Sequence, residues 1–233
     1  KGLLGIINGI PANLEIDEKY IQDQLSRRQK GHGRGKRMKI ENDYAEIHSG
    51  VRLGKTIGAP IGLIINNADY GNWKKNMSIE ATNKKIKEIT LPRPGHADLA
   101  GIQKFGFSDI RNVIERSSAR ETAMRVGIGS ICRKLLEDIG VQVGSRVIQI
   151  HDVKDNSEID LDKGAGFIRD KADLSDVRCI NNQKTKRMKQ RIDEAKNIGD
   201  SVGGTFEVFA TGVPIGLGSY VQWFDKLQSK IHS

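Results

Sequence analysis

The sequence lacks the features that define several classes of protein. It contains no run of about eighteen consecutive apolar residues, so a membrane-spanning helix is not expected. Its first residues lack the apolar region and the cleavage site of a signal peptide, and a cytoplasmic location is expected. Aromatic residues make up only 5% of the 233 residues, so the core has to be built mainly from Ile, Val, Leu and Ala.

Cysteine and metal-ligand patterns are also scarce. The only two cysteines, Cys132 and Cys179, lie far apart and lack Cys-x-x-Cys spacing. This usage favours buried thiols in a reducing compartment over a disulfide. The five histidines show no metal-ligand spacing, so no metal is expected.

What the sequence does contain is an excess of positive charge. Lys and Arg number 38 against 29 Asp and Glu, which gives a net charge of +9. This excess favours an anionic partner, and nucleic acid, phosphorylated metabolites and acidic membranes all satisfy it. The length allows one large domain or two small ones.

Hydrophobic periodicity predicts a mixture of strands and helices. Strands are expected at residues 3–7, 44–48, 61–65, 141–150 and 206–210, and helices at 17–28, 118–139 and 184–198. Residues 61–65 are apolar on both faces, which is typical of a strand buried between layers. A loop with a short helix is expected at 68–89, and an exposed polar excursion at 152–176. Because strands and helices alternate irregularly, the expected fold class is α+β.

The helix expected at 118–139 has two notable features. Ser118 followed by Glu121 matches a capping box. Gly127 and Gly129 lie inside the helix, where each costs about 1 kcal/mol relative to alanine. We therefore expect these glycines to permit close packing against a sheet.

The stretch from residue 93 to 122 concentrates groups that bind anions. It contains four arginines and a serine pair: Arg93, Arg111, Arg116, Arg120, Ser117 and Ser118. It is expected to run straight into a helix N-terminus, where backbone donors and the helix dipole favour an anion. Guanidinium groups bind carboxylate and phosphate bidentately, which indicates a ligand site. The alternative is a solvated basic face.

One histidine stands at the start of this stretch. His96 follows the rigid turn Pro94-Gly95, and an imidazole can donate or accept a proton near neutral pH. Catalysis is one interpretation. The other is a structural histidine that hydrogen-bonds Asp98 or a backbone carbonyl.

A second basic segment runs from Arg27 to Lys39. It carries Arg28 and Arg34, with glycines at alternate positions 31, 33 and 35 that can let the backbone approach a ligand closely. The spacing does not match a Walker A loop. The segment could bind RNA, although no aromatic residues interleave with it for base stacking.

Several segments, in order along the chain, together resemble motifs of the chorismate synthase family. They are Arg27-Arg28-Gln29 with Gly31-His32-Gly33-Arg34-Gly35, Ser49-Gly50-Val51 with Gly58-Ala59-Pro60, Arg93-Pro94-Gly95-His96-Ala97-Asp98, Arg116-Ser117-Ser118-Ala119-Arg120-Glu121-Thr122, Gly199-Asp200-Ser201-Val202-Gly203-Gly204, and Gly212-Val213-Pro214 with Gly216-Leu217-Gly218. The resemblance covers nearly the whole chain. It implies antiparallel sheets sandwiched by helices, and a homotetramer for the complete protein.

The resemblance also implies a reaction. The family eliminates phosphate from 5-enolpyruvylshikimate 3-phosphate in a trans-1,4 sense, giving chorismate for aromatic amino acid biosynthesis. Reduced FMN is required although the reaction has no net redox change, because the flavin lends an electron transiently. The expected partner is thus a small anionic substrate, with neither nucleic acid nor a membrane.

Residue roles follow from the positions that match the family motifs. His96 corresponds to a proposed proton donor to the reduced flavin. FMN contacts are implied for Arg116, Ser117 and Ser118. Substrate contacts are implied for four arginines: Arg28, Arg34, Arg93 and Arg120. NADPH binding is a further role for Arg28 and Arg34.

The chain also departs from the family pattern. Nothing matches the family's first motif, Gly-Glu-Ser-His-Gly, or its C-terminal third. Residues 1–233 are therefore expected to form a single domain truncated at both ends, inactive by itself. Two alternatives stay open: a nucleic-acid-binding protein that uses the Arg27–Lys39 loop, and a flavin- or anion-binding module that has lost its chemistry.

Overall fold

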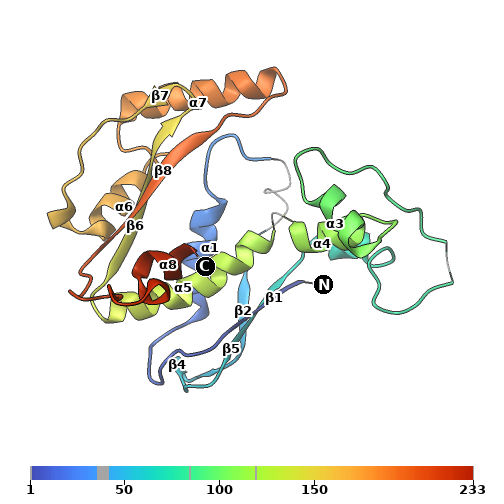
Figure 1. Cartoon of the computed structure of the whole chain (residues 1–233), viewed down its shortest axis with the longest axis horizontal. Helices are drawn as coiled ribbons and strands as arrows, with labels where there is room; N and C mark the ends of the chain where they lie inside the picture. The colour runs from blue at the N-terminus through green and yellow to red at the C-terminus, as the bar shows by residue number, and fades with distance from the viewer. Residues whose placement is uncertain (1, 36–41, 84, 119, 233) are drawn as a thin grey trace. The chain divides into compact units, whose positions relative to one another are not determined.

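The computed structural model describes residues 2–35, 42–83, 85–118 and 120–232. The chain divides into two compact units (Figure 1). Unit 1 comprises residues 1–30 and 35–132, and unit 2 comprises residues 31–34 and 133–233. The single-domain organisation expected from the sequence stays a prediction. No helix in the described part of the chain is both long and apolar enough to span a bilayer.

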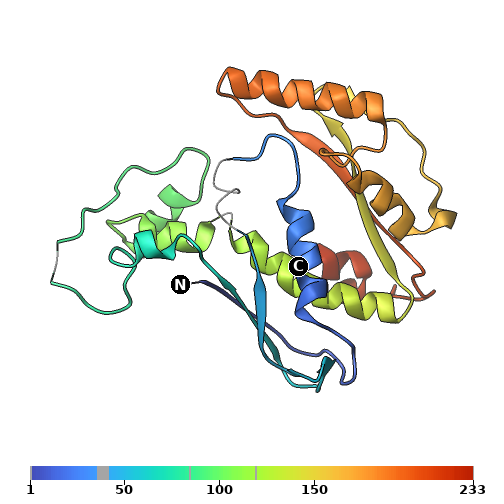
Figure 2. The same cartoon turned by 180° about the vertical axis from the view of Figure 1, so that it is seen from behind.

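Unit 1 is built on a three-stranded antiparallel sheet with the order β1-β5-β2 (Figures 1 and 2). Its strands are β1 (Gly2–Ile7), β2 (Ala45–Ser49) and β5 (Ile61–Asn66). All three lie where hydrophobic patterning predicts them. The short strands β3 (Val51–Arg52) and β4 (Lys55–Thr56) pair with each other between β2 and β5 in the chain.

Two long helices complete the core of unit 1. α1 (Glu18–Gln29) begins at Asp17, whose Oδ1 accepts a hydrogen bond from the backbone amide of Tyr20 at 2.8 Å. α5 (Glu121–Asp138) follows the predicted apolar periodicity and crosses from unit 1 into unit 2. Both helices are therefore confirmed.

The close approach of α5 to the sheet depends on a glycine other than those expected. A Cβ atom on Gly5 of β1 would overlap the Met124 side chain of α5. A Cβ on Gly127 would make only ordinary contact, 3.6 Å from Leu63 Cδ1, and Gly129 faces open space. The prediction that Gly127 and Gly129 permit close packing is thus wrong, since the strand provides the space.

The sheet of unit 1 is covered unevenly. In β5, Ile61, Leu63 and Ile65 are fully buried, as expected. Leu4 and Ile6 of β1, which lie opposite Ile64 and Gly62, are 69% and 67% exposed. The expectation of a strand buried between two layers is therefore met on one face of the described structure.

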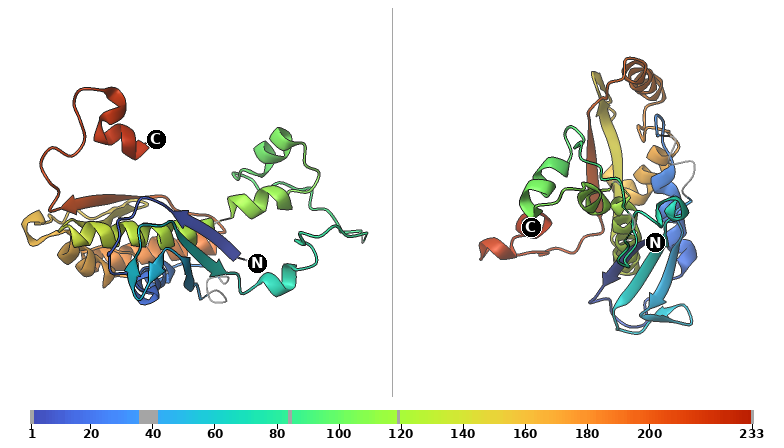
Figure 3. Two further views of the ribbon diagram at one scale, coloured as in Figure 1. Left: turned by 90° about the horizontal axis from the view of Figure 1, so that it is seen from below. Right: turned by 90° about the vertical axis from the view of Figure 1, so that its right-hand side faces the viewer.

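Three short helices lie between β5 and α5: α2 (Tyr70–Trp73), α3 (Asp98–Phe105) and α4 (Arg111–Ser117). The short helix at α2 was predicted, but α3 and α4 correct the expectation that residue 93 onward runs straight into one helix. Helices this short carry little periodic signal and depend on packing. Figure 3 shows α3 and α4 side by side, and a Cβ on Gly101 would lie 2.5 Å from Val113 Cγ1.

Unit 2 contains a second antiparallel sheet, with the order β7-β6-β8. Its strands are β6 (Gln142–Ile150), β7 (Val153–Lys154) and β8 (Gly204–Thr211). Its helical segments are η2 (Leu161–Lys163), α6 (Ala165–Asp173), α7 (Asn182–Asn197), η3 (Trp223–Asp225) and α8 (Leu227–His232). Antiparallel sheets mixed with helices confirm the α+β class.

The helix α6 corrects the expected polar excursion at 152–176. Ala165, Ile168 and Ala172 are buried at helical spacing, and α6 packs on β6. The many charged residues around it conceal this stripe in the sequence. β8 differs in the opposite direction: it is a strand as expected, but its apolar residues Phe206 and Val208 are 67% and 60% exposed.

The cysteines divide between two environments. Cys132 is exposed, which corrects the expectation of two buried thiols. Cys179 is buried, and desolvation raises the pKa of its thiol.

Replacing Gly144 by alanine is expected to destabilise the protein by about 1 to 3 kcal/mol. Gly144 lies on β6 where α6 approaches, and a Cβ there would stand 2.5 Å from the Ala165 carbonyl oxygen. Because that oxygen belongs to the backbone, α6 itself has to move. Urea unfolding followed by circular dichroism measures the change.

The matched control is Gly129→Ala, at an open position within α5. It is expected to stabilise the protein by up to about 1 kcal/mol, because alanine favours a helix over glycine. A Gly144→Ala protein as stable as wild type would contradict the packing argument.

Candidate anion-binding site

Unit 1 contains a cavity of about 300 Å³, referred to here as the α4 cavity. Its apolar wall includes Tyr70, Trp73, Ile89 and Ile114, and its polar part includes Arg111, Ser118 and Arg120. An apolar wall with a few polar groups is typical of small-molecule sites, and this volume lies at the lower end of their range. The sequence predicts the polar residues, but not the wall formed by α2 and the segment before α3.

Two of the predicted substrate arginines meet at one carboxylate. Arg120 Nη1 donates to Asp43 Oδ1 at 2.5 Å, and Arg28 Nη1 lies 3.4 Å from Asp43 Oδ2. Arg120 Nη2 also donates to the Asn66 carbonyl at 2.8 Å. Arg28 and Arg120 thus come together although 92 positions in the sequence separate them. Asp43 was not predicted, because a single aspartate before a strand carries no distinguishing signal.

Arg93, a third predicted substrate arginine, pairs with Asp98 of the same sequence motif. Its Nε and Nη2 donate to the two carboxylate oxygens of Asp98, each at 2.8 Å, and its backbone amide donates to Oδ2 at 2.9 Å. Asp98 is completely buried. The hydrogen bonds from Arg93 lower the pKa of the Asp98 carboxyl from 3.8 to about 2.

Acid is expected to remove a stabilising contribution from Asp98. Because the folded state holds this proton more weakly than the unfolded state, the contribution is complete above about pH 4 and disappears as the pH falls toward 2. Asp98→Asn should therefore lower the melting temperature at pH 7 and flatten its decline between pH 4 and 2. Thermal unfolding by circular dichroism at a series of pH values measures both effects. Asp23→Asn, at an exposed position on α1, is the control and should change neither.

His96 is exposed, in the turn that leads into α3. Its backbone amide donates to the Arg93 carbonyl at 3.4 Å. Among the described residues its imidazole makes no hydrogen bond or ion pair, and Asp98 is occupied by Arg93. The structural alternative, a histidine bonded to Asp98, is thus not observed. His96 does not line the α4 cavity.

The predicted flavin residues lie where α4 ends and α5 begins. Ser117 Oγ donates to the Val113 carbonyl at 2.9 Å, and Ser118 Oγ accepts from the Arg120 amide at 3.3 Å. The Ser118 carbonyl accepts from the Glu121 amide at 2.9 Å. Ser118 therefore precedes the helix as predicted, but its hydroxyl binds Arg120 rather than completing a capping box.

Arg116 points to a second hollow of unit 1. Its side chain is 84% exposed, and the distance of 3.8 Å between its Nη2 and Glu121 Oε1 is long for an ion pair. It lines a groove of about 900 Å³ together with Leu4, Phe107 and Met124. Glu115 lines both this groove and the α4 cavity, so the two hollows adjoin.

Arg111 is less available to bind a ligand than its position at the α4 cavity suggests. Its Nη1 pairs with Asp109 Oδ2 at 2.5 Å, and its Nη2 donates to the Lys87 carbonyl at 2.8 Å. These bonds hold the segment before α3 against the start of α4. Arg111 therefore contributes to the shape of the cavity wall.

The Gly-rich loop at residues 31–34 belongs to unit 2, where it packs on α7. His32 Nε2 lies 2.8 Å from Asp193 Oδ1, and the His32 amide donates to the Asp176 carbonyl at 3.0 Å. A Cβ on Gly33 would lie 2.6 Å from Ile192 Cγ2. Gly33 thus permits an internal contact in place of the expected approach to a ligand. Arg34 is exposed beside it, whereas Lys36, Arg37 and Lys39 lie outside the described residues.

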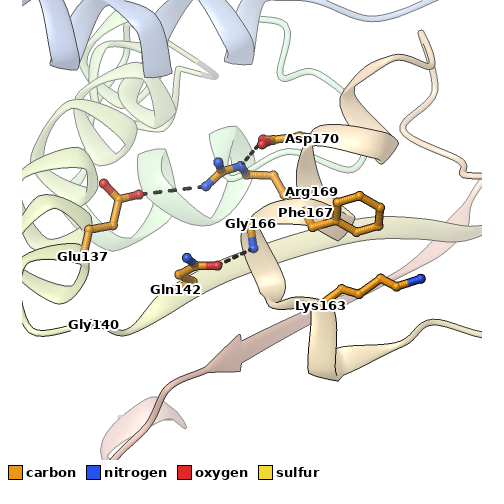
Figure 4. Close-up of a pocket in the computed structure, with 8 residues that line it drawn as sticks. All are labelled: Glu137, Gly140, Gln142, Lys163, Gly166, Phe167, Arg169 and Asp170. Carbon is orange, nitrogen blue, oxygen red and sulfur yellow. Dashed lines mark hydrogen bonds and ion pairs between the residues drawn. The ribbon is translucent and has the colours of Figure 1, made fainter.

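Unit 2 also contains a hollow, of about 550 Å³, beside α6 (Figure 4). There Arg169 Nε donates to Asp170 at 2.8 Å, and its Nη1 lies 3.9 Å from Glu137. Gln142 Oε1 accepts from the Gly166 amide at 3.0 Å. With two carboxylates against Arg169 and Lys163, this hollow suits a multiply charged anion less well than the Arg28–Asp43–Arg120 cluster.

The described residues contain no group of three or more His, Cys, Asp or Glu side chains arranged to hold a metal ion.

Comparison with known proteins gives one consistent result. A family model described as chorismate synthase matches residues 1–233. The chain is 51% identical over 232 residues to the chorismate synthase of Alkaliphilus metalliredigens, covering 99% of this chain and 60% of that protein. It is 47% identical over 237 residues to that of Aquifex aeolicus, with the same two coverages.

A solved structure agrees. A crystal structure of chorismate synthase aligns over 100% of this chain and 60% of its own, with a TM-score of 0.79 and 38% identity. The chain therefore spans about three fifths of the length of the relatives that it matches.

Proposed function

The chain belongs to the chorismate synthase family, and from this premise we propose that it forms part of an enzyme that makes chorismate. The reaction is the trans-1,4 elimination of phosphate from 5-enolpyruvylshikimate 3-phosphate, a step of aromatic amino acid biosynthesis. The family match over all 233 residues is the observation that carries the proposal. The chemistry of unit 1 supports it.

The substrate carries a phosphate and two carboxylates, so it needs several cationic partners. Arg120 lies at the α4 cavity, and Asp43 joins it to Arg28. The cluster of these three residues keeps one net positive charge, which favours an anion. Arg93 and Arg34 are proposed as further substrate contacts. For Arg93, whose side chain is 39% exposed, this requires a contact beyond its pairing with Asp98.

The residues at the junction of α4 and α5 fit a flavin in part. The aromatic and aliphatic wall of the α4 cavity suits a planar ring system, and Arg116 is exposed on the adjoining groove, where it can meet a phosphate. Arg116, Ser117 and Ser118 would hold FMN. When bound and reduced, FMN supplies an electron transiently to the substrate.

His96 is proposed to hold a proton on its imidazole and deliver it to the bound flavin. Its exposure and its lack of a side-chain partner among the described residues leave the ring available for this task. Reduction of the flavin by NADPH, with Arg28 and Arg34 as contacts, stays a prediction. A homotetramer and a cytoplasmic location are proposed on the family resemblance alone.

The proposal is tested on a chimera, in which this chain replaces the matching 60% of the Alkaliphilus metalliredigens protein. With reduced FMN and 5-enolpyruvylshikimate 3-phosphate, the chimera should release phosphate and chorismate in equal amounts. The 233-residue chain by itself is expected to be inactive. Absence of turnover in a folded chimera would contradict the proposal.

The same preparation separates the alternatives. A module that has lost its chemistry would bind FMN or the substrate without producing chorismate. A nucleic-acid-binding protein would ignore flavin and bind RNA with an affinity that falls steeply with salt. The packing of residues 31–34 on α7 already weakens that reading, because it occupies part of the proposed RNA-binding loop.

A further inference from the structure

Asp43 is the buried point at which two proposed substrate arginines meet. Its side chain is 2% exposed, and each carboxylate oxygen faces a different guanidinium group: Oδ1 faces Arg120, and Oδ2 faces Arg28. One carboxylate therefore fixes the separation and relative orientation of two cations.

Each arginine is also tied to a second element. Arg28 on α1 donates from Nη2 to Thr122 Oγ1 in the first turn of α5 at 2.7 Å. Arg120 donates to the Asn66 carbonyl at the end of β5. Asp43, two residues before β2, contacts both guanidinium groups and so links these elements.

Without a negative charge at this position, two guanidinium groups with side chains only 17% and 8% exposed would repel each other at low dielectric. The repulsion would drive at least one of them to another orientation. Asp43 does not line the α4 cavity, so it does not contact a ligand there. Its influence on a ligand has to pass through the arginines.

We propose that Asp43 is a positioning residue that orients Arg28 and Arg120 for the phosphate or carboxylate groups of the substrate. The proposal rests on the proposed function, because it assigns these arginines to the substrate. It predicts that a carboxylate of the wrong length at position 43 preserves the charge of the cluster but misplaces the arginines.

The informative variant is Asp43→Glu, since Asp43→Asn removes the charge that both guanidinium groups contact and can fail to fold. Asp43→Glu is expected to weaken binding of 5-enolpyruvylshikimate 3-phosphate to the chimera by about tenfold, the equivalent of one charged hydrogen bond. Isothermal titration calorimetry measures this affinity. In the chimera, KM should rise by a similar factor while kcat changes by less than about threefold.

The matched control is Glu18→Gln on α1. Glu18 accepts from the Tyr44 hydroxyl at 2.6 Å and from the Ile47 amide at 2.9 Å, so it anchors α1 to β2 without contacting either arginine. Its loss should lower the melting temperature and leave substrate affinity unchanged. A purely structural Asp43 would behave in the same way as Glu18.

A double mutant sharpens the test. Arg28→Gln should weaken binding, and Asp43→Glu should then add less to this loss than it does in wild type, because part of its effect passes through Arg28. Three outcomes would each overturn the proposal. They are wild-type substrate affinity in Asp43→Glu, a loss of substrate affinity in Glu18→Gln equal to that in Asp43→Glu, and fully additive losses of affinity in the Arg28→Gln, Asp43→Glu double mutant. If the wild-type chimera neither binds nor converts the substrate, the proposed function falls and this proposal falls with it; if the wild-type chimera is active and only the variant pattern fails, the proposed function stands.

Discussion

His96→Ala is expected to lower the turnover of the chimera by about 10²- to 10⁴-fold, the usual contribution of a general acid. The affinities for FMN and for 5-enolpyruvylshikimate 3-phosphate should remain close to wild type. The imidazole is exposed and makes no hydrogen bond or ion pair among the described residues, so its removal leaves the fold intact. Steady-state kinetics at saturating reduced FMN, with separate titrations of both ligands, measure these quantities.

The control for this variant is a second exposed histidine of unit 1. His48 lies on β2, with Nε2 3.4 Å from Glu46 Oε2. His48→Ala should leave turnover unchanged. Partial recovery of His96→Ala by added imidazole would support proton transfer, whereas wild-type turnover in His96→Ala would exclude the acid role.

Arg120→Ala is expected to destabilise unit 1 by about 3 to 5 kcal/mol, because it leaves the buried Asp43 with only the longer contact to Arg28. It should also weaken substrate binding, since an anionic group loses its partner. Urea unfolding followed by the fluorescence of Trp73, which lines the α4 cavity, measures the first effect. Calorimetry under conditions where the variant is folded measures the second.

Arg116→Ala is the matched control for Arg120→Ala. Arg116 lies on the same stretch, but its side chain is 84% exposed and its contact with Glu121 is long. Its loss should change stability by no more than about 0.5 kcal/mol. Equal stability losses for the two variants would show that the Asp43–Arg120 pair contributes nothing beyond an ordinary surface contact.

The elements that the sequence predicts well are those with long or pure hydrophobic patterns. β5 is apolar from Ile61 to Ile65, and α5 repeats apolar residues over five turns. The helices α3 and α4 were not predicted because seven or eight residues contain only two turns, too few for a clear periodic pattern. Both helices are stabilised by contacts such as that of Gly101 with Val113. α6 escaped because its buried residues are small and stand among charged ones.

The candidate site, too, was predicted only in part: the motifs identify its arginines and His96 but not their partners. Motif positions place Arg28, Arg93, His96 and Arg120 in the chain, but they carry no information on which acids pair with the arginines. Asp43 meets Arg120 across 77 positions of sequence, a relation set by the fold of unit 1. The pairing of Arg93 with Asp98 is local, yet the motif alone also allowed His96 to take that carboxylate.

The exposed side of β8 has a practical consequence for every experiment above. Among the described residues no strand pairs with the outer side of β8, which lies at the edge of its sheet with Phe206 and Val208 exposed. Such a strand is a template for pairing with another chain. Preparations of the 233-residue chain will therefore tend to self-associate as concentration rises, and apparent ligand affinities and unfolding midpoints will drift with the amount of protein used. Dilution series, with light scattering alongside each titration, separate that colloidal behaviour from the chemistry of unit 1.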